Sequence, residues 1–131
     1  MQCKMLDYPF IYTGYYAKTN VYIKNDLVPI SISYSTPHQL RWIQNYKPLV
    51  PNGYLLKLYK EKCIQEDEYI IMYTVQLDDL DRTKVIYDIF NISGGKSPIL
   101  MCYEKSFEFC HRNLVSDWLN ASGIVSCLEY S

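Results

Sequence analysis

The residues best suited to chemistry in this 131-residue chain lie in one short segment near its C-terminal end. Cys102 and Glu104 come first, and Cys110, His111 and Arg112 follow a few residues later. A thiol becomes a nucleophile when a helix N-terminus or an imidazole favours its thiolate. Histidine can shuttle a proton, and arginine offers a planar fork that matches carboxylate or phosphate. We therefore take Cys102, Glu104 and His111 as candidate catalytic residues.

Each of these residues also has a structural alternative. Cysteine is among the most buried residue types, so Cys110 is also typical of an inert core position. His111 is compatible with a partly exposed helix residue, and Arg112 with a surface ion pair to Glu108 or Asp117. Because the three polar-capable residues follow a strand–loop–helix turn together, we favour the functional interpretation.

Two other kinds of site match the sequence less well. Zinc bound through Cys102, Cys110 and His111 would have three ligands at a spacing unlike that of standard zinc knuckles, so no metal is predicted, and no other cofactor. The segment Gly94–Ser97 (GGKS) resembles the end of a phosphate loop, but such a loop follows a strand and opens a helix. Here the glycines follow a predicted helix, which indicates a C-terminal cap.

Composition limits the class of protein. The length fits one domain, and 49% apolar with 21% charged residues is ordinary for a globular chain. A net charge of −1 argues against nucleic acid as the main partner. No apolar run approaches the ~20 residues that span a bilayer, and no signal peptide is evident, so we expect a cytoplasmic protein without a membrane partner. Five cysteines without a framework spacing predict reduced thiols.

Alternation of strand and helix patterns predicts the elements that position the segment. The predicted strands are Phe10–Ala17, Leu27–Tyr34, Pro98–Tyr103 and Ile124–Leu128. The second alternates with period two, and Pro29 places it at a sheet edge or delays its start to Ile30. The third is a continuous apolar run, as expected of a central parallel strand.

Helical spacing accounts for most of the remaining chain. Besides a short helical turn around His38–Ile43, the predicted helices are Tyr54–Tyr59, one that starts at Glu66–Glu68 and keeps one face over Tyr69–Leu80, one from an Asp81 cap to about Ile92, and Ser106–Ala121 closed by Gly123. The order β-β-α-α-α-β-α-β predicts one α/β domain over residues 1–131, with a small, mostly parallel sheet covered by helices on both faces in a Rossmann-like three-layer arrangement. Ligands of such sheets bind at the carboxyl ends of the strands, where the Cys102–Arg112 segment lies.

Two stretches resemble the signature of the domain of unknown function 488 family. Residues 100–105 (LMCYEK) form an apolar strand ending in Cys-x-Glu, and residues 109–119 (FCHRNLVSDWL) supply Cys-His-Arg and an apolar–acidic helix. The stretches around Ile30–Ser33 and Tyr46–Leu49 are similar to short bacterial and phage members. The resemblance implies an α/β fold and marks Cys102, Glu104, Cys110, His111 and Arg112 as the family-type site.

The resemblance does not imply a particular activity. Family members often carry an Asp-Val-Arg type sequence after the second strand, and this chain has Ser31–Ser35 (SISYS) there. A charged helper residue from that strand is therefore absent.

Three functions fit these observations. The first is a binding protein for a small, anionic, nucleotide-like ligand, with phosphate held by the helix N-terminus and Arg112 and a base stacked on Tyr15, Tyr16, Trp42 or Tyr103. The ligand-binding residues predicted for it are Thr13, Gly14, Tyr15, Ser31, Ser33, Cys102, Tyr103, Glu104, Cys110, His111 and Arg112. A phage-encoded protein of this kind would sequester a nucleotide immune signal in the host cytoplasm.

The second function is a Cys/His/Glu-dependent hydrolase or transferase acting on a nucleotide or ribosyl substrate. The third is an interaction module that uses the 14 tyrosines of the chain as its surface, with a second copy of the chain as one possible partner.

Overall fold

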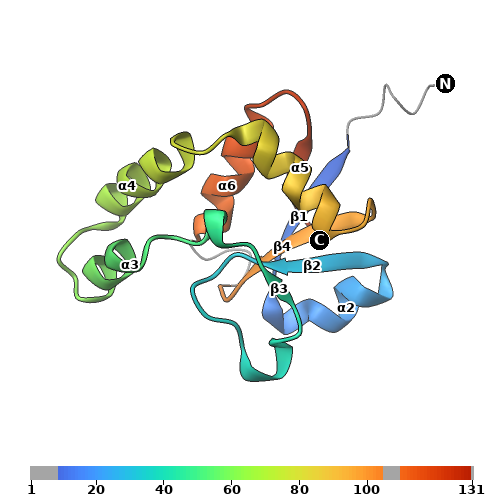
Figure 1. The fold of residues 1–131 in the computed structure, drawn as a ribbon. Coiled ribbons are helices and arrows are strands. Elements are labelled where there is room, and N and C mark those ends of the chain that lie inside the picture. The colour runs from blue at the N-terminus through green and yellow to red at the C-terminus, as the bar shows by residue number, and fades with distance from the viewer. Residues whose placement is uncertain (1–8, 105–109, 131) are drawn as a thin grey trace.

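The structure is a computed structural model that describes residues 9–104 and 110–130. Its centre is a sheet of parallel strands in the order β3-β2-β4-β1-β5 (Figure 1). The strands are β1 (Phe10–Tyr15), β2 (Leu27–Ser31), β3 (Gln44–Asn45), β4 (Ser97–Cys102) and β5 (Ser126–Glu129). The predicted α/β class and parallel sheet are confirmed.

Strand β4 lies at the middle of the sheet, as its continuous apolar run predicts. It pairs with β1 on one side and β2 on the other, and every residue from Pro98 to Cys102 is buried. A strand in this position is covered on both faces, which explains why its sequence does not alternate.

Helices cover both faces of the sheet and make three layers. Leu100 of β4 packs in the larger core with α5 (Arg82–Ile92) and α6 (His111–Asn120), whereas Ile99 and Met101 pack in a smaller core with α2 (Thr19–Lys24). Figure 1 shows α5 and α6 on one side of the sheet and α2 on the other. The arrangement is the predicted Rossmann-like sandwich.

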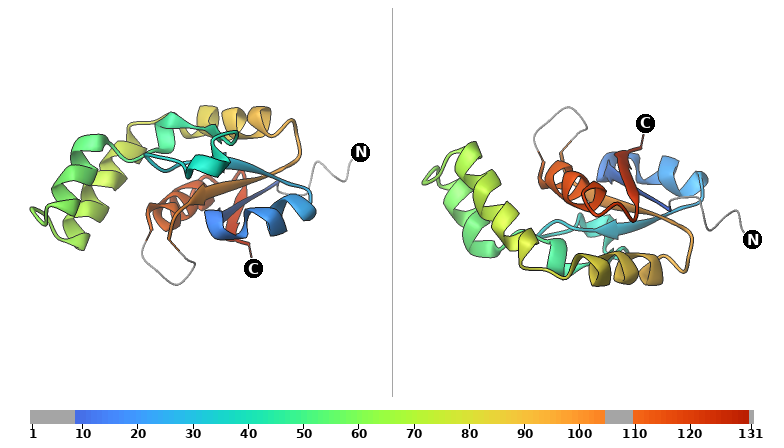
Figure 2. Two further views of the ribbon diagram at one scale, coloured as in Figure 1. Left: turned by 90° about the horizontal axis from the view of Figure 1, so that it is seen from below. Right: turned by 90° about the horizontal axis from the view of Figure 1, so that it is seen from above.

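Two further helices, α3 (Gly53–Lys60) and α4 (Glu66–Asp78), pack against each other. Both views of Figure 2 show this pair extending past one end of the sheet. Helix α4 also contacts α6, and its start is fixed by a capping box in which Glu68 Oε1 accepts from the backbone N–H of Gln65 at 2.9 Å. The contact between α4 and α6, which includes Tyr73 against His111, places the pair beside the start of α6.

Several boundaries differ from the sequence prediction. Helix α2 and strand β3 were not predicted, β1 and β2 end early, and unpredicted 3₁₀ turns occupy Tyr16–Lys18 and Lys47–Leu49. The helical turn predicted around His38–Ile43 is present as a 3₁₀ turn at His38–Leu40. Helix α6 begins at His111 rather than Ser106, because Cys110 has an extended backbone (φ −151°); Ser106 itself lies outside the described residues. The caps are as predicted: Asp81 accepts from Lys84 N, and Gly94 and Gly95 end α5 with positive φ.

Pro29 was predicted to place this strand at a sheet edge or to delay its start to Ile30. Both alternatives are wrong, since β2 begins at Leu27 and lies between β3 and β4. The reason is local. The register with β4 includes Pro29, whereas the register with β3 begins at Ile30. At the proline β2 therefore has a strand partner on one side, as an edge strand has.

No helix in the described ranges combines the length and apolar character needed to cross a membrane.

Candidate functional site

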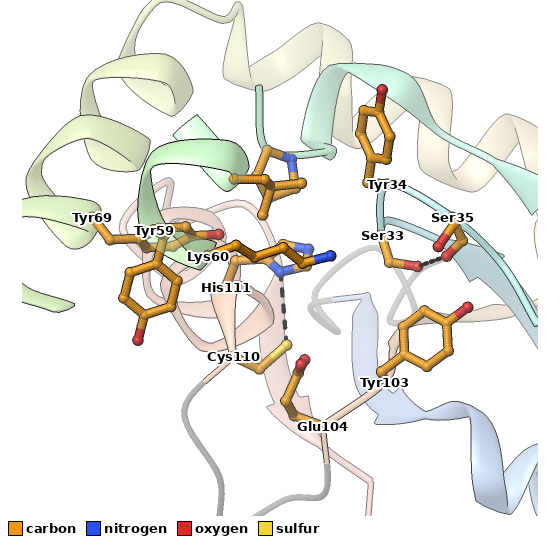
Figure 3. A pocket seen from close by; sticks show the side chains of 12 residues that line it. Ser33, Tyr34, Ser35, Tyr59, Lys60, Tyr69, Tyr103, Glu104, Cys110 and His111 are labelled. Carbon is orange, nitrogen blue, oxygen red and sulfur yellow. Dashed lines mark hydrogen bonds between the residues drawn. The ribbon is translucent and has the colours of Figure 1, made fainter. Parts of the chain in front are cut away.

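A cavity of about 370 Å³ opens at the carboxyl ends of β2 and β4. Four tyrosines make much of its wall, so we call it the tyrosine cavity (Figure 3). Its lining residues are Ser33, Tyr34, Ser35, Pro51, Leu56, Tyr59, Lys60, Tyr69, Tyr103, Glu104, Cys110 and His111. This is the sheet edge where the sequence places a ligand site.

The sheet topology brings the lining residues together. Strands β2 and β4 are neighbours, with Ser31 opposite Met101. The residues that follow them, Ser33 and Glu104 among others, therefore meet at one edge. Cys110 is the N-cap of α6, and Lys60 ends α3.

His111 is buried and held in one orientation. Its Nε2–H donates to the Ile32 carbonyl oxygen at 2.7 Å, and since a carbonyl only accepts, the ring proton must be on Nε2. Nδ1 is then left as an acceptor 3.7 Å from the Cys110 sulfur. Burial, and secondarily the Arg112 charge, lower the His111 pKa to about 4. The imidazole is therefore neutral at pH 7.

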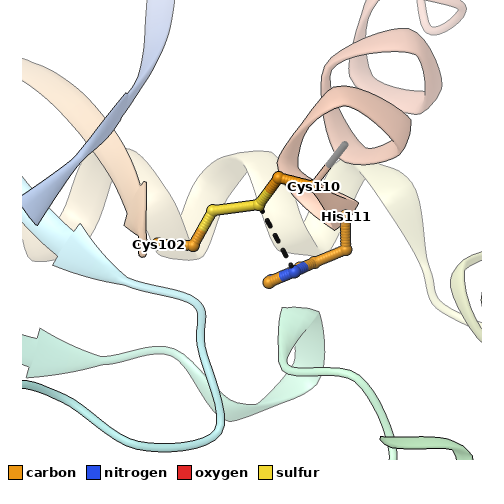
Figure 4. Close-up of side chains that lie close together, drawn as sticks. All are labelled: Cys102, Cys110 and His111. Atoms are coloured by element: carbon orange, nitrogen blue, oxygen red, sulfur yellow. Dashed lines mark hydrogen bonds between the residues drawn. A yellow bond between two sulfur atoms is a disulfide. The ribbon is translucent and has the colours of Figure 1, made fainter. Parts of the chain in front are cut away.

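Cys102 and Cys110 are joined as a disulfide in this structure (Figure 4). The prediction that the cysteines are reduced thiols is wrong for this pair, because the end of β4 and the start of α6 converge and bring the two sulfurs together. Cys63 and Cys127 are free thiols, and Cys3 lies outside the described residues. Cys110 is only 2% exposed, yet it reaches the cavity wall.

Arg112 does not present its fork to the cavity. The side chain is fully buried, and its Nε and Nη2 donate to the two carboxylate oxygens of Glu129, each at 3.1 Å. Nη1 donates to the Glu104 carbonyl at 2.6 Å and to the Cys102 sulfur at 3.0 Å. Thr13 Oγ1 also donates to Glu129, at 2.7 Å. The predicted phosphate-binding fork is thus used on the Glu129 carboxylate, and this part-buried pair stands in place of the expected surface pair with Asp117; Glu108, the other expected partner, lies outside the described residues.

The predicted residues of β1 do not line the cavity. Thr13 contacts Glu129. A Cβ on Gly14 would lie 2.6 Å from the Tyr22 hydroxyl, so this glycine allows α2 to pack closely on the sheet. The same hydroxyl accepts from Tyr15 N at 3.2 Å. In this structure the contacts of Thr13, Gly14 and Tyr15 join β1 to β5 and α2.

Ser31, which ends β2, and Ser33, which follows it, lie in different surroundings. The Tyr16 hydroxyl lies 2.6 Å from both Ser31 Oγ and Ser33 Oγ, which makes a buried polar network on the α2 side. Ser33 also lines the cavity, and Ser31 does not. Of the predicted stacking residues, Tyr103 lines the cavity, with 47% of its surface exposed, and Tyr16 lies behind it, edge-on at 5.0 Å.

Sequence reasoning missed the part of the wall supplied by α3, α4 and the β2 extension. The missed residues are Tyr34, Pro51, Leu56, Tyr59, Lys60 and Tyr69. Helical spacing places Tyr59 and Tyr69 on inward faces, but only the packing of α3 and α4 shows that those faces meet the strand ends. The one feature of the sequence that pointed to this wall was the abundance of tyrosine, since four tyrosines line the cavity.

A family model described as the active DUF488-N3 subclade (DUF488-N3a) matches residues 21–123. The chain belongs to the domain of unknown function 488 family. The match to this family contains the whole tyrosine cavity and the Cys102–Arg112 segment, and it leaves out Thr13 and Glu129. Neither the curated proteins nor the solved structures gave a match.

Proposed function

We propose that this chain is a hydrolase or transferase that acts on a nucleotide or ribosyl substrate in the tyrosine cavity, with Glu104 as the catalytic carboxylate. The observation that carries the proposal is the convergence of Glu104, Cys110 and His111 on one aromatic-walled cavity at the carboxyl edge of a parallel sheet. The subclade whose model matches is described as active, which agrees with a catalytic role.

The cavity suits the parts of a nucleotide. Its volume of about 370 Å³ is in the range of small-molecule sites. Tyr103 and Tyr34 are 47% and 71% exposed, so their faces are accessible to a base. Lys60 brings an ammonium group to the wall and provides the counter-charge for a phosphate that Arg112, paired with Glu129, does not.

Glu104 fits the chemistry at the anomeric carbon of a ribosyl group. Breaking the bond from that carbon to its leaving group builds positive charge on the sugar, which a nearby carboxylate stabilises. The same carboxylate can accept a proton from an attacking water or alcohol. The Arg112 Nη1 donates to the Glu104 carbonyl at 2.6 Å, so the buried guanidinium acts as a positioning residue that holds this turn at the cavity.

The disulfide separates this assignment from a thiol mechanism. While Cys102 and Cys110 are bonded to each other, neither sulfur is a thiolate nucleophile. Among the described lining residues Glu104 is the carboxylate, and it needs no reduction to act.

The same disulfide favours a second candidate, a protein that binds the nucleotide-like ligand without changing it. Sequestration needs the aromatic wall and Lys60 but no free thiol and no nucleophile. In a phage-encoded protein, this activity would remove a nucleotide immune signal from the host cytoplasm.

One experiment separates the two candidates. The purified chain is incubated with a panel of nucleotides, dinucleotides and ADP-ribose derivatives, and masses are followed by native mass spectrometry and chromatography. The enzyme proposal expects a product from the wild type and from the exposed control Glu66→Gln, and intact ligand bound to Glu104→Gln.

A ligand retained unchanged at one per chain by the wild type would establish sequestration. Absence of both product and adduct across the panel would contradict both candidates and leave the tyrosine-rich surface and a protein partner.

A further inference from the structure

We propose that in the reduced protein Cys102, Cys110 and His111 form a binding site for a soft divalent metal ion of the zinc type, at the floor of the tyrosine cavity. The three ligand atoms lie within 4.8 Å of one another and all three residues are buried. No other group of this kind occurs in residues 9–104 and 110–130. Figure 4 shows the two sulfurs and the imidazole converging. The assignment is independent of the proposed reaction at Glu104.

The spacing fits tetrahedral coordination. Zinc–sulfur bonds near 2.3 Å and zinc–nitrogen bonds near 2.0–2.1 Å place two ligand atoms about 3.6 Å apart for sulfur and nitrogen, and about 3.8 Å for two sulfurs. The Cys110 sulfur and His111 Nδ1 are 3.7 Å apart. The Cα atoms of Cys102 and Cys110 are 7.6 Å apart, wider than the usual 4.4–6.8 Å of disulfides. The backbones of β4 and α6 therefore already leave room between the sulfurs.

The surroundings orient the ligands as in metal sites. Metal-bound histidines usually donate their other ring N–H to a carbonyl or carboxylate, which fixes the tautomer. His111 does this with the Ile32 carbonyl at 2.7 Å, so that its Nδ1 lone pair faces the sulfurs. The edge of the ring also rests against Tyr73, at 5.6 Å between centroids. Arg112 Nη1, 3.0 Å from the Cys102 sulfur, is placed to donate to a thiolate.

The negative charge of the two thiolates of the reduced protein favours a divalent cation between Cys102 and Cys110. Two buried thiolates would carry an uncompensated double negative charge, because the Arg112 charge is already matched by Glu129. A divalent ion makes the site neutral. A thiol or phosphine reductant first supplies two electrons, with two protons from solvent, to open the disulfide; metal binding then releases the two thiol protons.

Three protein ligands leave one coordination position open. Because Cys110 and His111 line the tyrosine cavity, that position faces the space where a ligand would sit, as in zinc sites that keep a water. The sequence spacing led us to predict no metal at these three residues, and the proposal departs from that prediction because their ligand atoms converge in the structure. The two cysteines are separated by 8 positions, longer than in a zinc knuckle, since a strand end and a helix start bring them together instead of a tight turn.

Cobalt(II) is the probe for this site, added without oxygen to chain reduced with a phosphine. Reduction is verified by counting five thiols per denatured chain. We expect one cobalt per chain with a thiolate-to-cobalt charge-transfer band, displaced by one equivalent of zinc. The band should be lost in Cys102→Ser, Cys110→Ser and His111→Gln, and kept in the matched controls Cys63→Ser and His38→Gln, with folding checked by circular dichroism.

A second measurement needs no variant. Bound zinc should protect Cys102 and Cys110, and not Cys63, from alkylation of the reduced chain, as located by peptide mass spectrometry. A folded, fully reduced wild type that takes up neither metal would overturn the proposal, and so would unchanged uptake by Cys102→Ser and Cys110→Ser. Because the readout is metal uptake and thiol protection, failure here is distinct from a failure of catalysis at Glu104.

Discussion

The family motif divides into two regions that use similar side chains differently. What we call the buried half consists of Cys102 and Arg112 with their partners Thr13 and Glu129, and its polar atoms are matched to one another. The cavity half consists of Glu104, Cys110 and His111, which line the tyrosine cavity. Arg112, whose planar fork suits anions, thus lies in the buried half, while the residues facing the cavity are a carboxylate, a sulfur and a neutral imidazole.

This division shows that the chemical type of a motif residue does not reveal whether its side chain faces the cavity. Arg112 makes two hydrogen bonds to Glu129 and one to the Glu104 carbonyl, so a ligand phosphate would have to displace Glu129 to reach it. The hydrogen bonds of the buried half join the ends of β4, α6 and β5. The residues of the cavity half are positioned by these joined ends.

The largest expected effect comes from breaking the buried half. Arg112→Leu leaves Glu129 without its buried partner, and we expect the free energy of unfolding to fall by about 3–5 kcal/mol. Urea denaturation followed by circular dichroism measures it. Lys84→Ala, which removes an exposed ion pair with Asp88, is the control and should cost at most about 0.5 kcal/mol. A stable Arg112→Leu protein that had lost only ligand affinity would put Arg112 back in the binding site.

A second test uses the protonation of His111 in the metal-free protein. The folded pKa is about 4, below the ordinary value near 6.5, so the unfolded chain binds more protons between these values. Stability should therefore fall as the pH drops from about 6.5 to about 4, by roughly 3 kcal/mol from this group. The fall should be smaller in His111→Gln than in His38→Gln; an equal fall in both would mean that His111 is not held neutral.

In the cavity half, Tyr103→Ala should affect binding more than folding. Removing a stacking face costs about 1–3 kcal/mol of affinity per base, which isothermal titration with ADP-ribose would detect. Tyr87→Ala, an exposed tyrosine of α5 outside the cavity lining, is the control. Equal losses in the two variants would point to a tyrosine surface rather than a stacking site.

The smallest expected effect is at Lys60. Because its side chain is exposed, Lys60→Ala should change stability by no more than about 0.5 kcal/mol. It should lower ADP-ribose affinity in a manner that added salt reduces. Lys84→Ala, on α5, should leave that affinity unchanged, and a loss matching that of Lys60→Ala would indicate only a general charge effect.

The sequence predicted the features that depend on local patterns. The apolar run of β4, the Asp81 cap and the glycines after α5 each follow from neighbouring residues, and the Cys-x-Glu and Cys-His-Arg stretches identified the family. The sequence placed Cys102 at a strand end and Cys110 in the following helix, but it left open whether the two residues meet.

What could not be predicted depends on contacts between distant segments. Glu129 reaches Arg112 only because β5 lies beside β1 at the edge of the sheet. Nothing in the residues around Glu129 indicates that its carboxylate would pair with Arg112. Lys60 and Tyr59 reach the cavity through the packing of α3 on α4. Helix α2 has six residues, too few for periodicity, and depends on Tyr22 fitting against Gly14.

The most direct test of the division is to titrate the ¹⁵N-labelled chain with ADP-ribose and follow the backbone amide shifts. The account predicts that the largest changes fall on the cavity side, at Ser33, Tyr34, Tyr103, Glu104 and His111, with Thr13 and Glu129 little affected. Changes concentrated at Thr13, Tyr15 and Glu129 would contradict it, because they would show the ligand entering the buried half and displacing Glu129 from Arg112.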